Sequence, residues 1–167
     1  MSDVILDLKN EGLFINDELE LTTNISFLYG KNGTRLKNTG GISVGNGSIG
    51  IHTTGLGSLI ENSGNIAIKG SSTGIYGNES ASIDNQINGY VLSNDMETVG
   101  IYAESTNAMS INNSGTIELN GDKSIGIYGK GTGIKNITNS GTIKIGNSSN
   151  ANNPGIGIYS IGADTIT

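Results

Sequence analysis

The amino-acid sequence predicts an all-β fold, a right-handed parallel β-helix built as one solenoid of about six rungs of 23–31 residues. Three observations lead to this prediction. Two short signatures recur along the chain, apolar and polar residues alternate within them, and no segment has the apolar spacing of a helix. The composition agrees, because only 34% of the 167 residues are hydrophobic and stacked repeats share one thin, continuous core.

The first signature is Ile-x-Asn-Ser-Gly-x-Ile-x-Ile. It occurs at residues 60–68, 111–119 and 137–145, with weaker copies starting at Leu8 and Leu36. A copy starting at Ile83 is distorted, because its glycine is displaced to Gly89. Constant signatures separated by variable lengths indicate strands that keep their register while the loops between them vary.

The second signature is Gly-Ile-Tyr, found at residues 74–76, 100–102, 126–128 and 157–159. Residues 50–52 are a variant with histidine, and residues 27–29 supply a sixth copy. The aromatic positions follow one another at steps of 23, 24, 26, 26 and 31 residues. These steps set the expected rung length.

Alternating β-branched residues in runs bounded by Gly, Asn or Ser predict short strands, two or three per rung. Stacking the rungs turns equivalent positions into columns, and apolar columns must face the core. The alternation places Ile125 beside Ile127, and Ile156 beside Ile158, on the inward side. The main inward column of the second signature is expected to contain Ile51, Ile75, Ile101, Ile127 and Ile158.

An asparagine two residues after the first Ile of each unit predicts a second column, of amides. Stacked amides can satisfy one another, as in other stacked strands. We therefore interpret this column as a structural corner ladder, made of Asn10, Asn38, Asn62, Asn85, Asn113 and Asn139.

The aromatic residue of the second signature follows an inward Ile, so alternation places it outside or at a corner. Two interpretations are open: aromatic stacking along the shaft, or a stripe that binds a sugar or a partner. His52 has no companion ligand in the sequence and is interpreted as a replacement for tyrosine. The column contains Tyr29, His52, Tyr76, Tyr102, Tyr128 and Tyr159.

The domain organisation expected from these repeats is a single β-helix segment over residues 1–167. Residues 1–35 are expected to form an irregular first rung, and residues 36–167 the regular rungs. Residues 164–167 match the start of a repeat at residues 135–138. We therefore expect the chain to be a fragment of a longer solenoid that ends at the start of a further repeat.

Composition excludes several kinds of function. The chain has no cysteine, one histidine and a net charge of −6, which disfavours a thiolate metal site, a nucleophilic triad and nucleic-acid binding. No apolar run is long enough to span a membrane. Glu61 and Asp84 are expected to be neighbouring acids on an outward column, which are usually just solvated. We expect no catalytic, metal-binding or cofactor-binding residues, and hence no enzyme.

The tandem Asn-Ser-Gly-Thr-Ile and Gly-Ile-Tyr-Gly units, clearest over residues 111–145, resemble the passenger domains of bacterial autotransporters of type V secretion, especially the large fusobacterial adhesins. The resemblance implies an extracellular passenger anchored at the outer membrane. Its implied role is a structural and adhesive shaft that meets a protein or glycan receptor on a host or bacterial cell. The resemblance names no receptor.

Two other functions remain as alternatives. One is a polysaccharide-acting β-helix lyase or hydrolase, and the other, ranked last, is an ice-binding solenoid, which would need a regular Thr-x-Thr face. Irregular loops on a rigid scaffold are where binding often lies. Here the candidate loops are residues 17–24, 85–97 and 146–154.

Overall fold

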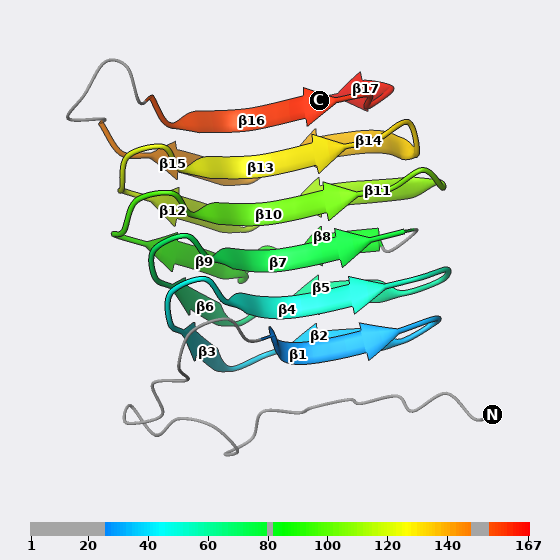
Figure 1. The fold of residues 1–167 in the computed structure, drawn as a ribbon, viewed down its shortest axis with the longest axis horizontal. Helices are drawn as coiled ribbons and strands as arrows, with labels where there is room; N and C mark the ends of the chain where they lie inside the picture. The colour runs from blue at the N-terminus through cyan, green and yellow to red at the C-terminus, as the bar shows by residue number, and fades with distance from the viewer. Residues whose placement is uncertain (1–25, 80–81, 148–153) are drawn as a thin grey trace.

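The computed structural model describes residues 26–79, 82–147 and 154–167, and every regular element in these ranges is a β-strand. The strands form three parallel sheets, and each rung contributes one strand to each sheet (Figure 1). The described residues complete five rungs and contribute two strands to a sixth. In Figure 1 the chain crosses the front from left to right and returns behind while it climbs, so the coil is right-handed. The predicted all-β parallel β-helix is confirmed.

Sheet I contains the strands that carry the aromatic signature: β1 (Ser26–Lys31), β4 (Ile49–Thr54), β7 (Thr73–Asn78), β10 (Val99–Glu104), β13 (Ile125–Lys130) and β16 (Ile156–Ile161). Sheet II contains the strands that lead into the asparagine column: β2 (Arg35–Asn38), β5 (Leu59–Asn62), β8 (Ser82–Asn85), β11 (Met109–Asn113), β14 (Ile134–Asn139) and β17 (Thr165–Ile166). Sheet III contains β3 (Gly41–Val44), β6 (Asn65–Ile68), β9 (Tyr90–Ser93), β12 (Thr116–Leu119) and β15 (Thr142–Ile145).

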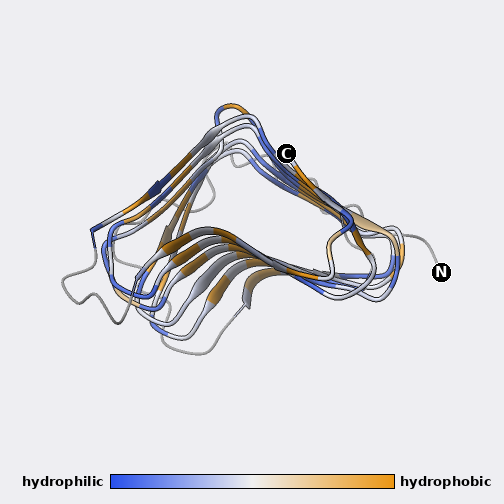
Figure 2. Ribbon diagram, turned by 90° about the horizontal axis from the view of Figure 1, so that it is seen from above, coloured by the Kyte–Doolittle hydropathy of each residue, from blue (hydrophilic) through white to orange (hydrophobic). Residues whose placement is uncertain are grey.

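The three sheets enclose a triangular cross-section, seen down the shaft in Figure 2. Each sheet contributes one main column of apolar side chains to the interior of the shaft. In sheet I this column is Leu28, Ile51, Ile75, Ile101, Ile127 and Ile158. In sheet II it is Leu36, Ile60, Ile83, Ile111, Ile137 and Ile166. In sheet III it is Ile42, Ile66, Val91, Ile117 and Ile143. Most of these side chains are fully buried, and exposure rises only towards the last rung.

The distorted repeat at Ile83 keeps the register of its neighbours. Val91 occupies the column position that Ile66 holds one rung earlier. The longer connection from Asn85 to Tyr90 is accommodated at the corner, where Ile87 is 80% exposed. Extra residues therefore change a corner and leave the core column intact.

The expected strict alternation is wrong at one place in sheet I. Gly126 and Ile127 are both buried, whereas Ile125 is partly exposed and Ile156 is 36% exposed. A Cβ atom on Gly126 would lie 2.5 Å from the carbonyl oxygen of Gly157. The equivalent glycines meet the carbonyl oxygen of the next rung's glycine at similar distances. This corner therefore requires a column of glycine, which shifts the inward face by one residue.

Residues 26–35 belong to a regular rung, although an irregular rung was expected over residues 1–35. Strand β1 pairs with β4 in continuous register, and β2 begins at Arg35. Residues 1–25, which include Asn10 and the loop 17–24, lie outside the described residues. At the other end, β17 pairs with β14 through Thr165 opposite Asn136, which is the register that the repeat predicts.

Charged side chains also follow the stacking. Ion pairs within the described residues join neighbouring rungs, among them Arg35–Glu61, Lys123–Glu97, Lys130–Glu104, Lys135–Asp164 and Lys144–Glu118. Because the Lys or Arg side chain is exposed in every one of these pairs, each ion pair stabilises the fold by only about 0–1 kcal/mol. Their main effect is to place opposite charges where equal charges on successive rungs would repel.

A charge placed in the core column should unfold the shaft. Ile137 is fully buried, and its strand neighbour Asn136 is exposed. Ile137→Asp should destabilise the protein by more than about 4 kcal/mol, because it buries an unpaired carboxylate. Asn136→Asp should stay within about 0.5 kcal/mol of the wild type. Thermal unfolding followed by circular dichroism measures both, and equal melting temperatures for the two variants would contradict the inward assignment.

Candidate functional site

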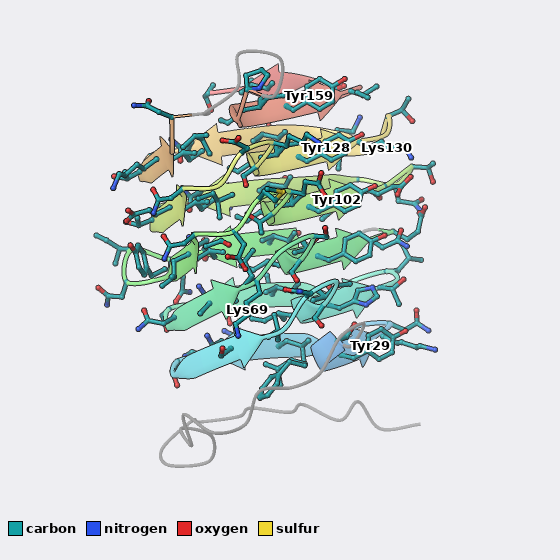
Figure 3. The ribbon with its side chains drawn as sticks, turned by 60° about the vertical axis from the view of Figure 1, so that its left-hand side comes forward. Tyr29, Lys69, Tyr102, Tyr128, Lys130 and Tyr159 are labelled. Atoms are coloured by element: carbon teal, nitrogen blue, oxygen red, sulfur yellow. The ribbon has the colours of Figure 1, made fainter. Side chains whose placement is uncertain are left out.

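The outer face of sheet I is the candidate site, because an aromatic column runs along it. Strand pairing places Tyr29, His52, Tyr76, Tyr102, Tyr128 and Tyr159 in one column, one residue per rung. Figure 3 shows the labelled tyrosines one above another on this face. The predicted column of aromatic residues therefore lies on the outside of the shaft.

The rings of this column stack on one another. Centroids of successive rings are 4.9, 4.7, 4.9, 4.9 and 5.3 Å apart from Tyr29 to Tyr159. The three pairs from His52 to Tyr128 are stacked, with interplanar angles of 25°, 14° and 10°. Such offset stacking is a favourable geometry for aromatic pairs. Inner rings cover much of each other's faces, so they offer edges and hydroxyl groups to a partner more than open ring faces.

Two further columns border the aromatic one. On one side lie partly exposed residues, four of the six aliphatic: Ser26, Ile49, Thr73, Val99, Ile125 and Ile156. On the other side lie mostly polar or charged residues: Lys31, Thr54, Asn78, Glu104, Lys130 and Ile161. The face therefore combines an apolar strip, an aromatic strip and a polar strip, all parallel to the shaft.

A small polar network fixes the middle of the column. The Tyr102 hydroxyl donates a hydrogen bond to Glu104 Oε2 at 2.9 Å, and Lys130 Nζ lies 2.7 Å from Glu104 Oε1. Partial burial, followed by the bond to Glu104, raises the pKa of Tyr102. The bond from Lys130 lowers the pKa of Glu104. At neutral pH the phenol is therefore a neutral donor and the carboxylate is ionised.

His52 occupies a tyrosine position and behaves as an aromatic spacer. Its ring stacks on Tyr76, and its Nδ1 lies 3.4 Å from the Ser26 hydroxyl oxygen. Burial lowers the pKa of His52 below 6.5. The imidazole is therefore largely neutral at physiological pH, in keeping with its interpretation as a replacement for tyrosine.

The asparagine column lies inside the shaft, at the corner between sheets II and III. Asn38, Asn62 and Asn85 are fully buried, and each Nδ2 donates to the Oδ1 of the next rung at 2.7–2.8 Å. Asn113 Nδ2 continues the chain to Asn139 Oδ1 at 2.7 Å. Each amide satisfies one neighbour with its donor and the other with its acceptor. Burial of Asn38, Asn62, Asn85 and Asn113 keeps these amides from any ligand, so their hydrogen bonds hold the rungs together.

Sequence reasoning missed a second internal polar column, made of hydroxyl groups. Ser48, Ser72, Thr98 and Ser124 are buried at the corner that leads into sheet I. Ser48 N donates to Ser72 Oγ at 3.1 Å, and the Thr98 and Ser124 hydroxyl oxygens are 2.9 Å apart. A signal was present, because a Ser or Thr stands two residues before the glycine of each Gly-Ile-Tyr unit in these rungs.

The expected acidic neighbours, Glu61 and Asp84, are adjacent in register on sheet II. Glu61 Oε2 is 2.6 Å from Arg35 Nε, so an ion pair already occupies this carboxylate. Among the described residues, no three His, Cys, Asp or Glu side chains are grouped so that they could hold a metal ion. The same part of the chain contains no helix that could span a membrane.

Two of the candidate loops lie partly or wholly outside the described residues. Residues 148–153 of the loop 146–154 and all of 17–24 lie outside the described residues. The stretch 85–97 is described, and it consists of the enlarged corner, strand β9 and the corner that leads to β10. In that second corner Met96 is 57% exposed.

Comparison of the chain with models of protein families, with curated proteins and with solved structures finds no significant match.

Removing one amide from the asparagine column should destabilise the fold. Asn85→Ala leaves the Asn62 donor and the Asn113 acceptor buried without their partner. Each lost partner costs about 1–3 kcal/mol. Asn112→Ala, on the exposed side of β11, should change stability by less than about 0.5 kcal/mol. Urea unfolding compares the two variants, and similar midpoints would show that the column does not stabilise the shaft.

His52 should make stability depend on pH near neutrality. Burial lowers its pKa in the folded protein below the ordinary value of 6.5, so the unfolded chain binds the proton more readily. Stability should therefore fall as the pH drops below 6.5. Glu97 and Glu104, whose pKa values are lowered from 4.5, add their own loss only at more acidic pH.

His52→Tyr restores the residue type of the column and should abolish the loss of stability just below pH 6.5. Melting temperatures measured from pH 7.5 to 5 test this expectation. An unchanged pH profile in the variant would mean that His52 is not the group responsible.

Proposed function

We propose that this chain is a segment of the extracellular passenger of a bacterial surface autotransporter, where it forms a structural and adhesive shaft. The observation that carries the proposal is the regular register of its rungs. The main columns of each sheet keep their positions from one rung to the next, and the shift between Met109 and Ser110 in sheet II leaves Ile111 paired with Ile137. Such a stack extends in one direction without changing its cross-section, which suits a protein that must present a surface away from a cell.

The resemblance of the repeats to autotransporter passengers supports the same proposal. Its signature residues have structural explanations in this chain. Asparagine fills the buried amide column, glycine permits the close approach of rungs, and tyrosine stacks outside. A sequence that repeats these solutions favours length and regularity over a single catalytic centre.

The contact surface that we propose for adhesion is the outer face of sheet I. Its aliphatic column is the next outward column before the aromatic one, three residues earlier on each strand, whereas the outward column of sheet II carries Lys37, Glu61, Asp84, Asn112 and Thr138. Exposed apolar side chains gathered on one face are typical of interaction surfaces. The proposed partner is a protein or glycan receptor on a host or bacterial cell.

A cell-binding experiment tests this proposal. The fluorescently labelled protein should bind a panel of bacterial and epithelial cells in a saturable manner. The double variant Val99→Thr and Ile125→Thr should bind less, because both positions lose apolar surface on sheet I. Threonine occupies this column naturally at Thr73, so the fold should be retained. Thr116→Ser and Thr142→Ser, on sheet III, form the matched control.

Three results would argue against the proposal. Equal binding by both double variants would show that the contact surface does not lie on sheet I. A variant lacking residues 146–154 would then test that loop. Absence of saturable binding across the panel would contradict an adhesive role for this segment. Release of shorter sugars from bacterial or host polysaccharides would favour the alternative, a polysaccharide-acting enzyme.

A further inference from the structure

The stacked tyrosines form pairs of identical phenols in direct contact across neighbouring rungs. Tyr102 lies between Tyr76 and Tyr128, with centroid distances of 4.9 Å on both sides. All three rings are partly exposed, so small oxidants can reach them. Strand pairing places the three tyrosines at equivalent positions of successive rungs, and their rings are nearly parallel, at 14° and 10°. The carbons of adjacent rings are therefore already close to one another in the folded protein.

The column also contains neighbouring rings that are not parallel. Tyr128 and Tyr159 are tilted by 35°, and Tyr29 and His52 by 58°, without loss of contact. Two rings that tilt towards each other bring their edges closer than two parallel rings do. The shaft thus accommodates tilted aromatic neighbours at the same strand spacing.

A proton acceptor is in place at the central tyrosine. Oxidation of a phenol by one electron makes its hydroxyl strongly acidic, so the proton must leave with the electron. The Tyr102 hydroxyl already donates to Glu104 Oε2, and Lys130 keeps that carboxylate ionised. This hydrogen bond favours oxidation at Tyr102 over its partners in the stack.

We propose that Tyr76, Tyr102 and Tyr128 are an oxidative cross-linking site, at which a peroxidase-type oxidant joins neighbouring rings of successive rungs as dityrosine. The chain has no cysteine, so a disulfide cannot join its rungs. A dityrosine bond would join them without a thiol.

The chemistry balances as follows. Each of two tyrosines gives one electron and its phenolic proton to the oxidant. The two radicals form one carbon–carbon bond between ring positions adjacent to the phenol carbons. The hydrogen on each of these carbons then moves to the phenol oxygen and restores both aromatic rings. Hydrogen peroxide, the terminal oxidant, takes the two electrons and two protons and becomes two molecules of water.

Tyr90 is a matched internal control. It is the one tyrosine of the six in the chain that lies outside the column. Its hydroxyl also donates to a carboxylate, that of Glu118, which in turn pairs with Lys144. It therefore shares the proton acceptor of Tyr102 but has Asn65 and Thr116 as its neighbours in register instead of tyrosines.

The experiment treats the dilute protein with horseradish peroxidase and hydrogen peroxide, and isolates the monomer by size exclusion. Digestion after Lys and Glu separates Tyr76, Tyr90, Tyr102 and Tyr128 into different peptides. Mass spectrometry should find the Tyr102 peptide joined to the Tyr128 or Tyr76 peptide, with the mass of two hydrogen atoms missing. The Tyr90 peptide should remain unlinked. Dityrosine fluorescence should stay at background when the protein, at the same concentration, is unfolded in urea before the oxidation.

Three variants complete the test. Tyr102→Phe keeps the stacked ring but removes the phenol, and both cross-linked peptides should disappear. Tyr90→Phe should leave their yield unchanged, and Glu104→Gln should slow their formation. The proposal is overturned if the monomer contains no cross-linked peptide, if the Tyr90 peptide is linked as often as the Tyr102 peptide, or if Tyr102→Phe retains the wild-type fluorescence.

Discussion

The structure depends on one constraint, which is that the column residues of each strand lie directly on their equivalents in the next rung at a single strand spacing. Every column must therefore consist of residues that are compatible with copies of themselves. Asparagine meets this condition inside the shaft because its amide both donates and accepts, and buried serine does so with one hydroxyl. Tyrosine meets it outside by stacking. Charged residues meet it more easily with an opposite charge as the neighbour, as Glu104 does with Lys130.

The same constraint explains how much of the fold could be predicted from the sequence. A residue that must match its copies recurs at a fixed place in the repeat, so the isoleucine, asparagine and tyrosine columns could be assigned from spacing alone. The buried hydroxyl column could not, because serine is also the usual residue of an exposed turn. Alternation also failed to predict that two consecutive residues, Gly126 and Ile127, both face the interior. This arrangement arises from backbone contact between rungs, which alternation does not describe.

The candidate site could be predicted only in part, for a related reason. Spacing placed the aromatic residues in one column, but it left open whether they bind a ligand or stack. Ring geometry favours stacking for the inner residues, whose faces cover one another. The aliphatic border was not predicted, because alternation placed Ile125 and Ile156 in the core. The face that results is apolar, aromatic and polar in parallel strips, and it offers a partner a surface that repeats with every rung.

The most direct test of in-register stacking is a distance along the shaft between two outward positions of one column. Spin labels attached to Lys31→Cys and Lys130→Cys would report it, since the chain has no cysteine of its own and four strand pairings separate these residues. Double electron–electron resonance should give one narrow distribution near 19 Å, or about four times the strand spacing of about 4.8 Å. A broad distribution, or a main distance well beyond this value, would contradict the stacked shaft.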